Sequence, residues 1–196
     1  MRNCRNKRQI RIMPSFYIML ALAALIMPVQ WILAWSFAVF LHELGHYIMI
    51  CLCQGQVYGV ELGMSGAKIK AFIPTSAREF LCAIAGPVGS LLPLLAARWI
   101  PRVAICGLLH AAFNLLPITP LDGGRAVNCL VGRYLPHRER LADLIEIGTL
   151  CILTVLGLYV SVRFSMGVLP LLLPAALLLK QEKIKIPCNA MKQRVQ

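Results

Sequence analysis

Residues 12–41 form an unbroken run of 30 residues that contains no Asp, Glu, Lys or Arg. A helix of about 20 apolar residues is enough to cross the hydrocarbon core of a bilayer. The run is therefore too long for a single span, and Pro28 near its middle predicts a turn between two. Trp31 and Trp35 are suited to the membrane interface beside that turn. We expect helices at about 12–28 and 31–53.

Further apolar runs occupy residues 80–97, 103–121 and 147–179, and Arg163 divides the last run into two shorter spans. The hydrophobic share of the chain is 59% and the charged share 14%, against about 45–50% and 25% in soluble globular domains. This composition excludes an ordinary soluble enzyme and a disordered chain. The sequence predicts an all-α polytopic membrane protein with about six transmembrane helices in 12–180, between basic tails at 1–11 and 181–196.

The formal net charge of +12 would suit a nucleic-acid partner if the cations formed one patch. With six spans and the N-terminus in the cytosol, 17 of the 20 Lys and Arg residues fall on the cytosolic side. The exceptions are Arg98, Arg102 and Arg163. Such a bias follows the positive-inside rule. We therefore expect both termini in the cytosol, a lipid bilayer as partner, and no nucleic acid.

The second predicted span contains His42-Glu43-Leu44-Gly45-His46. Side chains at positions i and i+4 share one face of a helix, so His42 and His46 can hold one metal ion while Glu43 reaches its open coordination site. Ionisable groups within a span are costly, and each is a functional candidate. The alternative is a polar cluster that is satisfied without a metal.

A hydrolytic zinc site needs a third protein ligand and one open position. Of the eight acidic residues, six are expected in cytosolic loops or at span ends: Glu61, Glu79, Glu139, Asp143, Glu146 and Glu182. Asp122, at the end of the fourth apolar run, is the candidate ligand. The alternative for Asp122 is an ordinary helix-end residue in a Pro/Gly turn.

Pro117 and Pro120 each remove a backbone donor, and Gly123-Gly124 permits a tight turn. Irregular backbone at membrane depth is tolerated where it is buried in protein or lines a water-filled cavity. We therefore predict that the fourth helix is broken. Asn114 either caps the freed backbone groups or holds the backbone of a peptide substrate.

The two motifs, His42-Glu43-Leu-Gly-His46 and Asn114-x-x-Pro117-x-x-Pro120-Leu-Asp122-Gly123-Gly124, resemble those of the site-2 protease family of intramembrane zinc metalloproteases. The resemblance covers roughly residues 12–180. It implies Zn²⁺ bound by His42, His46 and Asp122, and Glu43 as the catalytic base. It also implies a membrane-tethered protein substrate, contacts to that substrate near Asn114, Pro117, Pro120 and Gly123, and regulatory membrane proteins as partners.

Gly86-Pro87 in the third span resembles another motif of this family, in which an Asn is common where this chain has Ser90. A helix kink with close packing is the alternative explanation for Gly86-Pro87. Within the family, the chain looks most like the sporulation-type members, which process a membrane-tethered pro-sigma factor. That likeness implies the membrane of a bacterial cell or forespore. Those proteins usually carry a C-terminal cystathionine-β-synthase-type domain, whereas about 16 residues follow Lys180 here.

Residues 57–73 alternate and contain a Gly-Met-Ser-Gly turn, which predicts a small cytosolic β-hairpin. Its edge could accept an extended peptide by strand addition, or the hairpin could simply cover the active site. His110 lies four residues before Asn114 on the same helix face. It either makes an interhelical hydrogen bond or stabilises an oxyanion.

The proposed chemistry is peptide hydrolysis, in which zinc lowers the pKa of a bound water toward ~7 and Glu43 accepts the proton. The rival hypothesis is a noncatalytic or metal-transporting membrane protein with a vestigial site. A transporter is expected to have polar residues along several spans, whereas here they concentrate on the second and fourth. A vestigial protease would typically lack Glu43.

Overall fold

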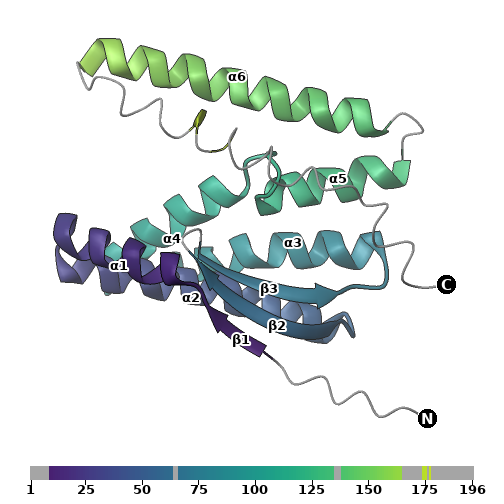
Figure 1. Ribbon diagram of the computed structural model, residues 1–196, viewed down its shortest axis with the longest axis horizontal. Helices are drawn as coiled ribbons and strands as arrows, with labels where there is room; N and C mark the ends of the chain where they lie inside the picture. Colours follow the sequence, from purple (N-terminus) through teal and green to yellow (C-terminus); the bar gives the residue numbers. More distant parts are fainter. Residues whose placement is uncertain (1–8, 64–65, 135–137, 165–173, 176, 178–196) are drawn as a thin grey trace.

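A computed structural model describes residues 9–63, 66–134, 138–164, 174–175 and 177. The described part of the chain is mainly helical, with one small sheet near the N-terminal helices (Figure 1). The elements are β1 Gln9–Ile12, α1 Pro14–Ile26, α2 Val29–Leu52, β2 Gln56–Gly63, β3 Gly66–Phe72, α3 Ser76–Leu91, the 3-10 helix η1 Leu92–Ala96, α4 Pro101–Asn114, α5 Asp122–Tyr134 and α6 Arg138–Phe164.

Three helical segments in the described part of the chain are long and apolar enough to cross a membrane: Val29–Leu52, Ser76–Ala96 and Leu141–Ser161. α1 is apolar but shorter. Large side chains such as Leu25, Leu95 and Tyr159 are exposed on these helices and η1, as expected where lipid replaces water. The predicted break between the first two helices is confirmed, because α1 ends at Ile26 and Pro28 precedes α2.

The fourth predicted helix is broken, as expected. α4 ends at Asn114, irregular backbone follows over 115–121, and α5 begins at Asp122. The expected helix 103–121 was therefore too long, and the helical character of 122–134 was not anticipated. The final predicted span lies almost entirely outside the described residues, which include only 174–175 and 177 beyond Phe164.

α6 begins well before the apolar run that predicted it. The helix starts at Arg138, and its candidate span runs from Leu141 to Ser161. Glu146 therefore lies inside the span and is only 7% exposed. The expectation that Glu146 occupies a loop or a span end was wrong, because the sequence pattern does not show that another segment covers this carboxylate.

The hairpin expected at 57–73 is present as β2 and β3, which pair antiparallel with Gln56 opposite Phe72. β1 pairs parallel with the other edge of β2, so the sheet order is β1-β2-β3. Residues 9–11, expected to belong to the basic N-terminal tail, are thus part of a sheet. The reason is that the edge of β2 supplies backbone partners that a sequence pattern cannot reveal.

α3 lies at the centre of the helices and packs against α2, α4 and α5 (Figure 1). Small residues allow the close approach of α2 and α3. A β-carbon at Gly89 would lie 2.5 Å from the carbonyl oxygen of Leu41, and one at Gly45 would meet the carbonyl of Ala85. Where the C-terminus of α2 meets the N-terminus of α3, Arg78 donates to the carbonyl oxygen of Cys53 at 3.1 Å.

Candidate metal centre

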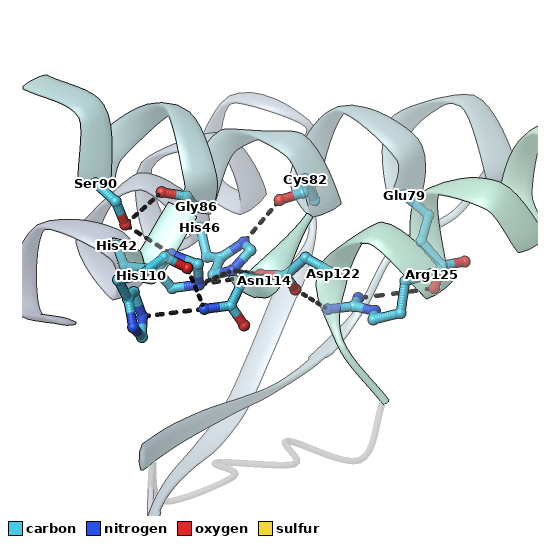
Figure 2. Close-up of polar contacts among 10 residues, drawn as sticks. All are labelled: His42, His46, Glu79, Cys82, Gly86, Ser90, His110, Asn114, Asp122 and Arg125. Carbon is cyan, nitrogen blue, oxygen red and sulfur yellow. Dashed lines mark hydrogen bonds and ion pairs between the residues drawn. The ribbon is translucent and has the colours of Figure 1, made fainter. Parts of the chain in front are cut away.

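Three buried side chains from two distant segments meet between α2 and α5. His42 and His46 lie one turn apart on α2, and Asp122 is the first residue of α5. Their exposed fractions are 3%, 8% and 8%. The structure thus brings together the three residues that the sequence singled out as metal ligands (Figure 2).

The donor atoms form a compact triangle. Oδ2 of Asp122 lies 3.0 Å from Nε2 of His42 and 3.0 Å from Nε2 of His46, and the two ring nitrogens are 3.1 Å apart. Ligands of tetrahedral zinc, bound at about 2.0–2.1 Å, lie roughly 3.3 Å from one another. Three electron-rich atoms this close together repel unless a cation lies among them. The two imidazoles and one carboxylate therefore fit Zn²⁺, with the fourth position left for water or substrate.

Partners on α3 orient both imidazoles. Nδ1 of His46 donates to the carbonyl oxygen of Cys82 at 2.7 Å, since a carbonyl can only accept. Nδ1 of His42 lies 2.9 Å from Oγ of Ser90, whose own hydroxyl donates to the carbonyl oxygen of Gly86 at 3.4 Å. Each Nδ1 therefore carries the proton, and each Nε2 presents its lone pair to the cluster.

The Gly86-Pro87 motif also serves the cluster. A β-carbon at Gly86 would lie 2.7 Å from Cδ2 of His46 and still closer to Nε2 and Cε1. Glycine at this position lets the backbone of α3 pass directly against the imidazole. Pro87 is fully buried in the same helix. Close packing, one of the two explanations left open by the sequence, is therefore confirmed for Gly86.

Charged residues surround the triangle. Glu43 follows His42 on α2 and lies near enough to interact with the charges of His46, Asp122 and Arg125. Arg125, one turn after Asp122, places a guanidinium nitrogen 3.7 Å from Oδ1 of Asp122 and another 3.7 Å from Glu79 on α3 (Figure 2). The carboxylate of Asp122 thus faces the histidines with one oxygen and Arg125 with the other.

His110 and Asn114 lie on α4 beside the cluster. The ring of His110 makes edge contacts with the rings of His42, at a centroid distance of 4.6 Å, and of Trp35, at 5.5 Å. The side-chain nitrogen of Asn114 donates to the carbonyl oxygen of His110 at 3.0 Å and lies 3.2 Å from its Nε2. The Asn114 side chain therefore bonds within its own helix, and His110 contacts the neighbouring helix through its ring.

The segment between α4 and α5 carries the remaining sequence candidates. Pro117 and Pro120 lie in the irregular backbone, and the Thr119-Pro120 bond is cis. A β-carbon at Gly123 would meet the carbonyls of Leu115 and Leu116. The backbone of Leu115 and Leu116 therefore packs directly against the first turn of α5, the turn that begins with Asp122.

The family model described as Peptidase M50B-like matches residues 16–117, slightly more than half of the chain and including the histidine motif on α2. The chain belongs to this peptidase family. Two relatives and one solved structure are also similar to this chain. "Putative zinc metalloprotease sll0528" of Synechocystis sp. is 34% identical over 116 residues. "Stage IV sporulation protein FB" of Bacillus subtilis is 28% identical over 167 residues.

The alignments with these two proteins cover 50% and 78% of this chain, but only 30% and 57% of theirs. The chain therefore spans about a third to just over half of the length of these relatives. A site-2 protease from Methanocaldococcus jannaschii aligns over 89% of both chains, with a TM-score of 0.58 and 20% identity. That match shows that the two proteins share a fold.

Sequence reasoning missed several residues around the site. Ser90 was noted only for departing from the family pattern, and the roles of Arg125, Glu146 and the Cys82 carbonyl were not anticipated. The departure at position 90 was a usable signal, since a polar residue in an apolar span requires a partner. The other three contacts depend on which helix faces meet.

Proposed function

We propose that this protein is a zinc-dependent intramembrane endopeptidase that hydrolyses a peptide bond of a membrane-associated substrate. The observation that carries the proposal is the buried triangle of His42, His46 and Asp122, whose donor atoms are 3.0–3.1 Å apart. Membership of the peptidase family supports the same chemistry. Zinc bound by these ligands supplies a Lewis acid that polarises the scissile carbonyl and acidifies water.

In this proposal, Glu43 is the general base and returns the proton to the leaving amine. Its place beside His42 on α2 and its electrostatic interaction with His46 and Asp122 support this role. Ser90 and the carbonyl of Cys82 hold the imidazoles in the required tautomer. Burial of the ligands excludes competing water from the protein side of the cluster.

A helical substrate has to unwind before its backbone is accessible. We propose that the unwound segment contacts Asn114, Pro117, Pro120 and Gly123, which follow α4 and lead to Asp122. The far edge of β3 is a second candidate contact, because β1 already pairs with the other edge of the hairpin. The likeness to the sporulation protein supports a pro-sigma factor as one substrate to test, with regulatory membrane proteins as further partners.

We also propose six spans in a single domain over 12–180, with both termini in the cytosol. Three candidate spans and the shorter α1 support four of these crossings, namely the first, second, third and fifth. The 17:3 distribution of basic residues expected from the sequence supports the orientation. Reporter fusions after Arg78, Arg98 and Tyr134 test it: cytosolic signals are expected at the first and third positions, and the opposite side at the second.

The deciding experiment combines cleavage and metal analysis. The wild-type chain is co-expressed with candidate single-span substrates and compared with Glu43→Gln, while bound zinc is measured in the purified proteins. We expect Glu43→Gln to retain zinc and lose cleavage. Asp143→Asn, a change of an exposed carboxylate on α6, serves as the matched control and is expected to cleave. Wild-type protein that binds no zinc and cleaves nothing would support the noncatalytic alternative.

A further inference from the structure

A buried carboxylate on α6 holds the segment that leads to the proposed ligand Asp122. Oε1 of Glu146 accepts the backbone N–H of Thr119 at 2.8 Å, and Oε2 lies 3.5 Å from the Thr119 hydroxyl. Glu146 is 7% exposed and lies within a candidate membrane span. An ionised acceptor makes a stronger hydrogen bond than a neutral one, and burying a carboxylate is costly unless it is well paired.

The same face of α6 makes apolar contacts with this segment. Leu150, one turn after Glu146, forms a buried cluster with Ile118 and Leu121, and Leu153 packs against that cluster. Side chains at i, i+4 and i+7 share one helix face. α6 therefore contacts residues 118–121 through the Glu146 carboxyl group and a row of apolar side chains. Figure 1 shows α6 running alongside α5, at whose N-terminus Asp122 lies.

On its other side, the segment lies against the start of α5. A β-carbon at Gly124 would lie 2.5 Å from the carbonyl carbon of Ile118 and 2.6 Å from the nitrogen of Thr119. Leu121 donates back to the carbonyl oxygen of Ile118 at 2.8 Å. The backbone of 118–121 is thus held between α5 and α6, and Thr119 lies three residues before Asp122.

We propose that Glu146 is a positioning residue: by fixing the Thr119 amide, it holds residues 116–121 in the conformation that directs Asp122 toward His42 and His46. This inference rests on the proposed function, because it assigns Asp122 to the metal. It also makes α6 an integral part of the site, although α6 supplies no proposed ligand. A displacement of the Glu146 face of α6 would release the third ligand.

The test uses the full chain in detergent or nanodiscs and three variants. Glu146→Met removes the acceptor at similar side-chain length and leaves the Thr119 amide unpaired. Glu146→Gln keeps a neutral acceptor oxygen and is the conservative rescue. Asp143→Asn removes an exposed carboxylate from the same helix one turn earlier and is the matched control. The measurements are hydrogen exchange of the 116–121 backbone, the rate at which loaded zinc is lost to a chelator, and kcat and KM for cleavage.

We expect Glu146→Met to exchange the 116–121 amides and to release zinc about 10-fold faster than wild type, with kcat reduced and KM little changed. Glu146→Gln should fall between the two, and Asp143→Asn should match wild type. If Glu146→Met does not fold, the intermediate values of Glu146→Gln carry the test. Exchange on α2 and α3 should stay at the wild-type rate in any folded variant.

Two results would overturn the proposal. One is wild-type exchange and zinc release in the Glu146 variants. The other is faster exchange by the same factor on 116–121, α2 and α3, because that pattern reports only a loss of overall stability. Failure of the proposed function looks different: wild-type protein would bind no zinc, while the contrast in exchange between the Glu146 variants and Asp143→Asn would still decide whether Glu146 holds the segment.

Discussion

Gly86 lies directly against the imidazole ring of His46, with no room for a β-carbon between the α3 backbone and Cδ2 of the ring. The same two helices also approach each other closely at Gly45 and Gly89. The atoms that a β-carbon at Gly86 would meet belong to the His46 ring, and the ring is held in turn by its hydrogen bond to the carbonyl oxygen of Cys82, so it cannot move aside at low cost. The position of the His46 imidazole, a proposed metal ligand, thus depends on the absence of a side chain at Gly86.

Gly86→Ala should displace His46 and impair the metal centre. Overpacking of this kind typically costs about 1–3 kcal/mol of stability, and here the strain falls on a ligand. We expect loss of most bound zinc and of cleavage, measured by elemental analysis and a substrate assay. Gly148→Ala is the matched control, since a β-carbon at Gly148 meets nothing within 4 Å. Normal zinc content in Gly86→Ala would contradict the structure at this contact.

Ser90→Ala should weaken zinc binding without removing a ligand. The change deletes the acceptor 2.9 Å from Nδ1 of His42, and loss of such an outer partner typically costs about 10-fold or more in metal affinity. Competition with a chelator of known affinity measures the effect. Ser36→Ala, at an exposed position on α2, should leave the affinity unchanged. Equal affinities in both variants would show that Ser90 does not orient His42.

The pKa of the Cys129 thiol on α5 depends on the charges of Glu79 and Arg125. Burial, and then the nearby Glu79 carboxylate that accepts its S–H, raise the pKa of Cys129 to about 11, against the opposing effect of Arg125. At pH 8.5 the thiolate fraction is therefore small, and alkylation should be slow and accelerate with rising pH. Glu79→Gln should lower the pKa and speed alkylation at pH 8.5, followed at Cys129 by mass spectrometry.

Glu61→Gln is the control for that measurement, because Glu61 lies on β2 and pairs with Lys70 at 2.7 Å. It should not alter the reactivity of Cys129. The Arg125–Glu79 pair is 3.7 Å long, with side chains 42% and 43% exposed, so Glu79→Gln should change stability by less than about 1 kcal/mol. Faster alkylation accompanied by a large loss of stability would indicate local unfolding instead.

Removal of zinc should lower the midpoint of thermal unfolding. A ligand that binds only the folded state adds about 2.7 kcal/mol at a free concentration 100-fold above its Kd. Wild-type protein should therefore unfold at a lower temperature after chelation and recover when zinc is restored. Asp122→Asn should show a much smaller response, whereas Asp143→Asn should behave as wild type. A midpoint that is independent of zinc in the wild type would contradict the proposed metal centre.

Much of the site was predictable from local pattern. His42 and His46 are four residues apart, so any helix through both brings them to one face. Asp122 stood out because the chain has only eight acidic residues and the other candidates were assigned elsewhere. Pro28 and the pair Pro117 and Pro120 marked the places where helices stop, because proline removes a backbone donor wherever it occurs.

The sequence alone determined three features: the apolar composition of the spans, the pairing of two imidazoles on one helix, and the break before Asp122. All three follow from composition or short-range spacing. Only the tertiary structure decided that Ser90 and the Cys82 carbonyl orient those imidazoles, that Gly86 makes room for one of them, and that Glu146 binds Thr119. These contacts join residues 27 to 48 positions apart, and they depend on which helix faces pack together. That choice is made by the packing of the whole chain, and no local pattern encodes it.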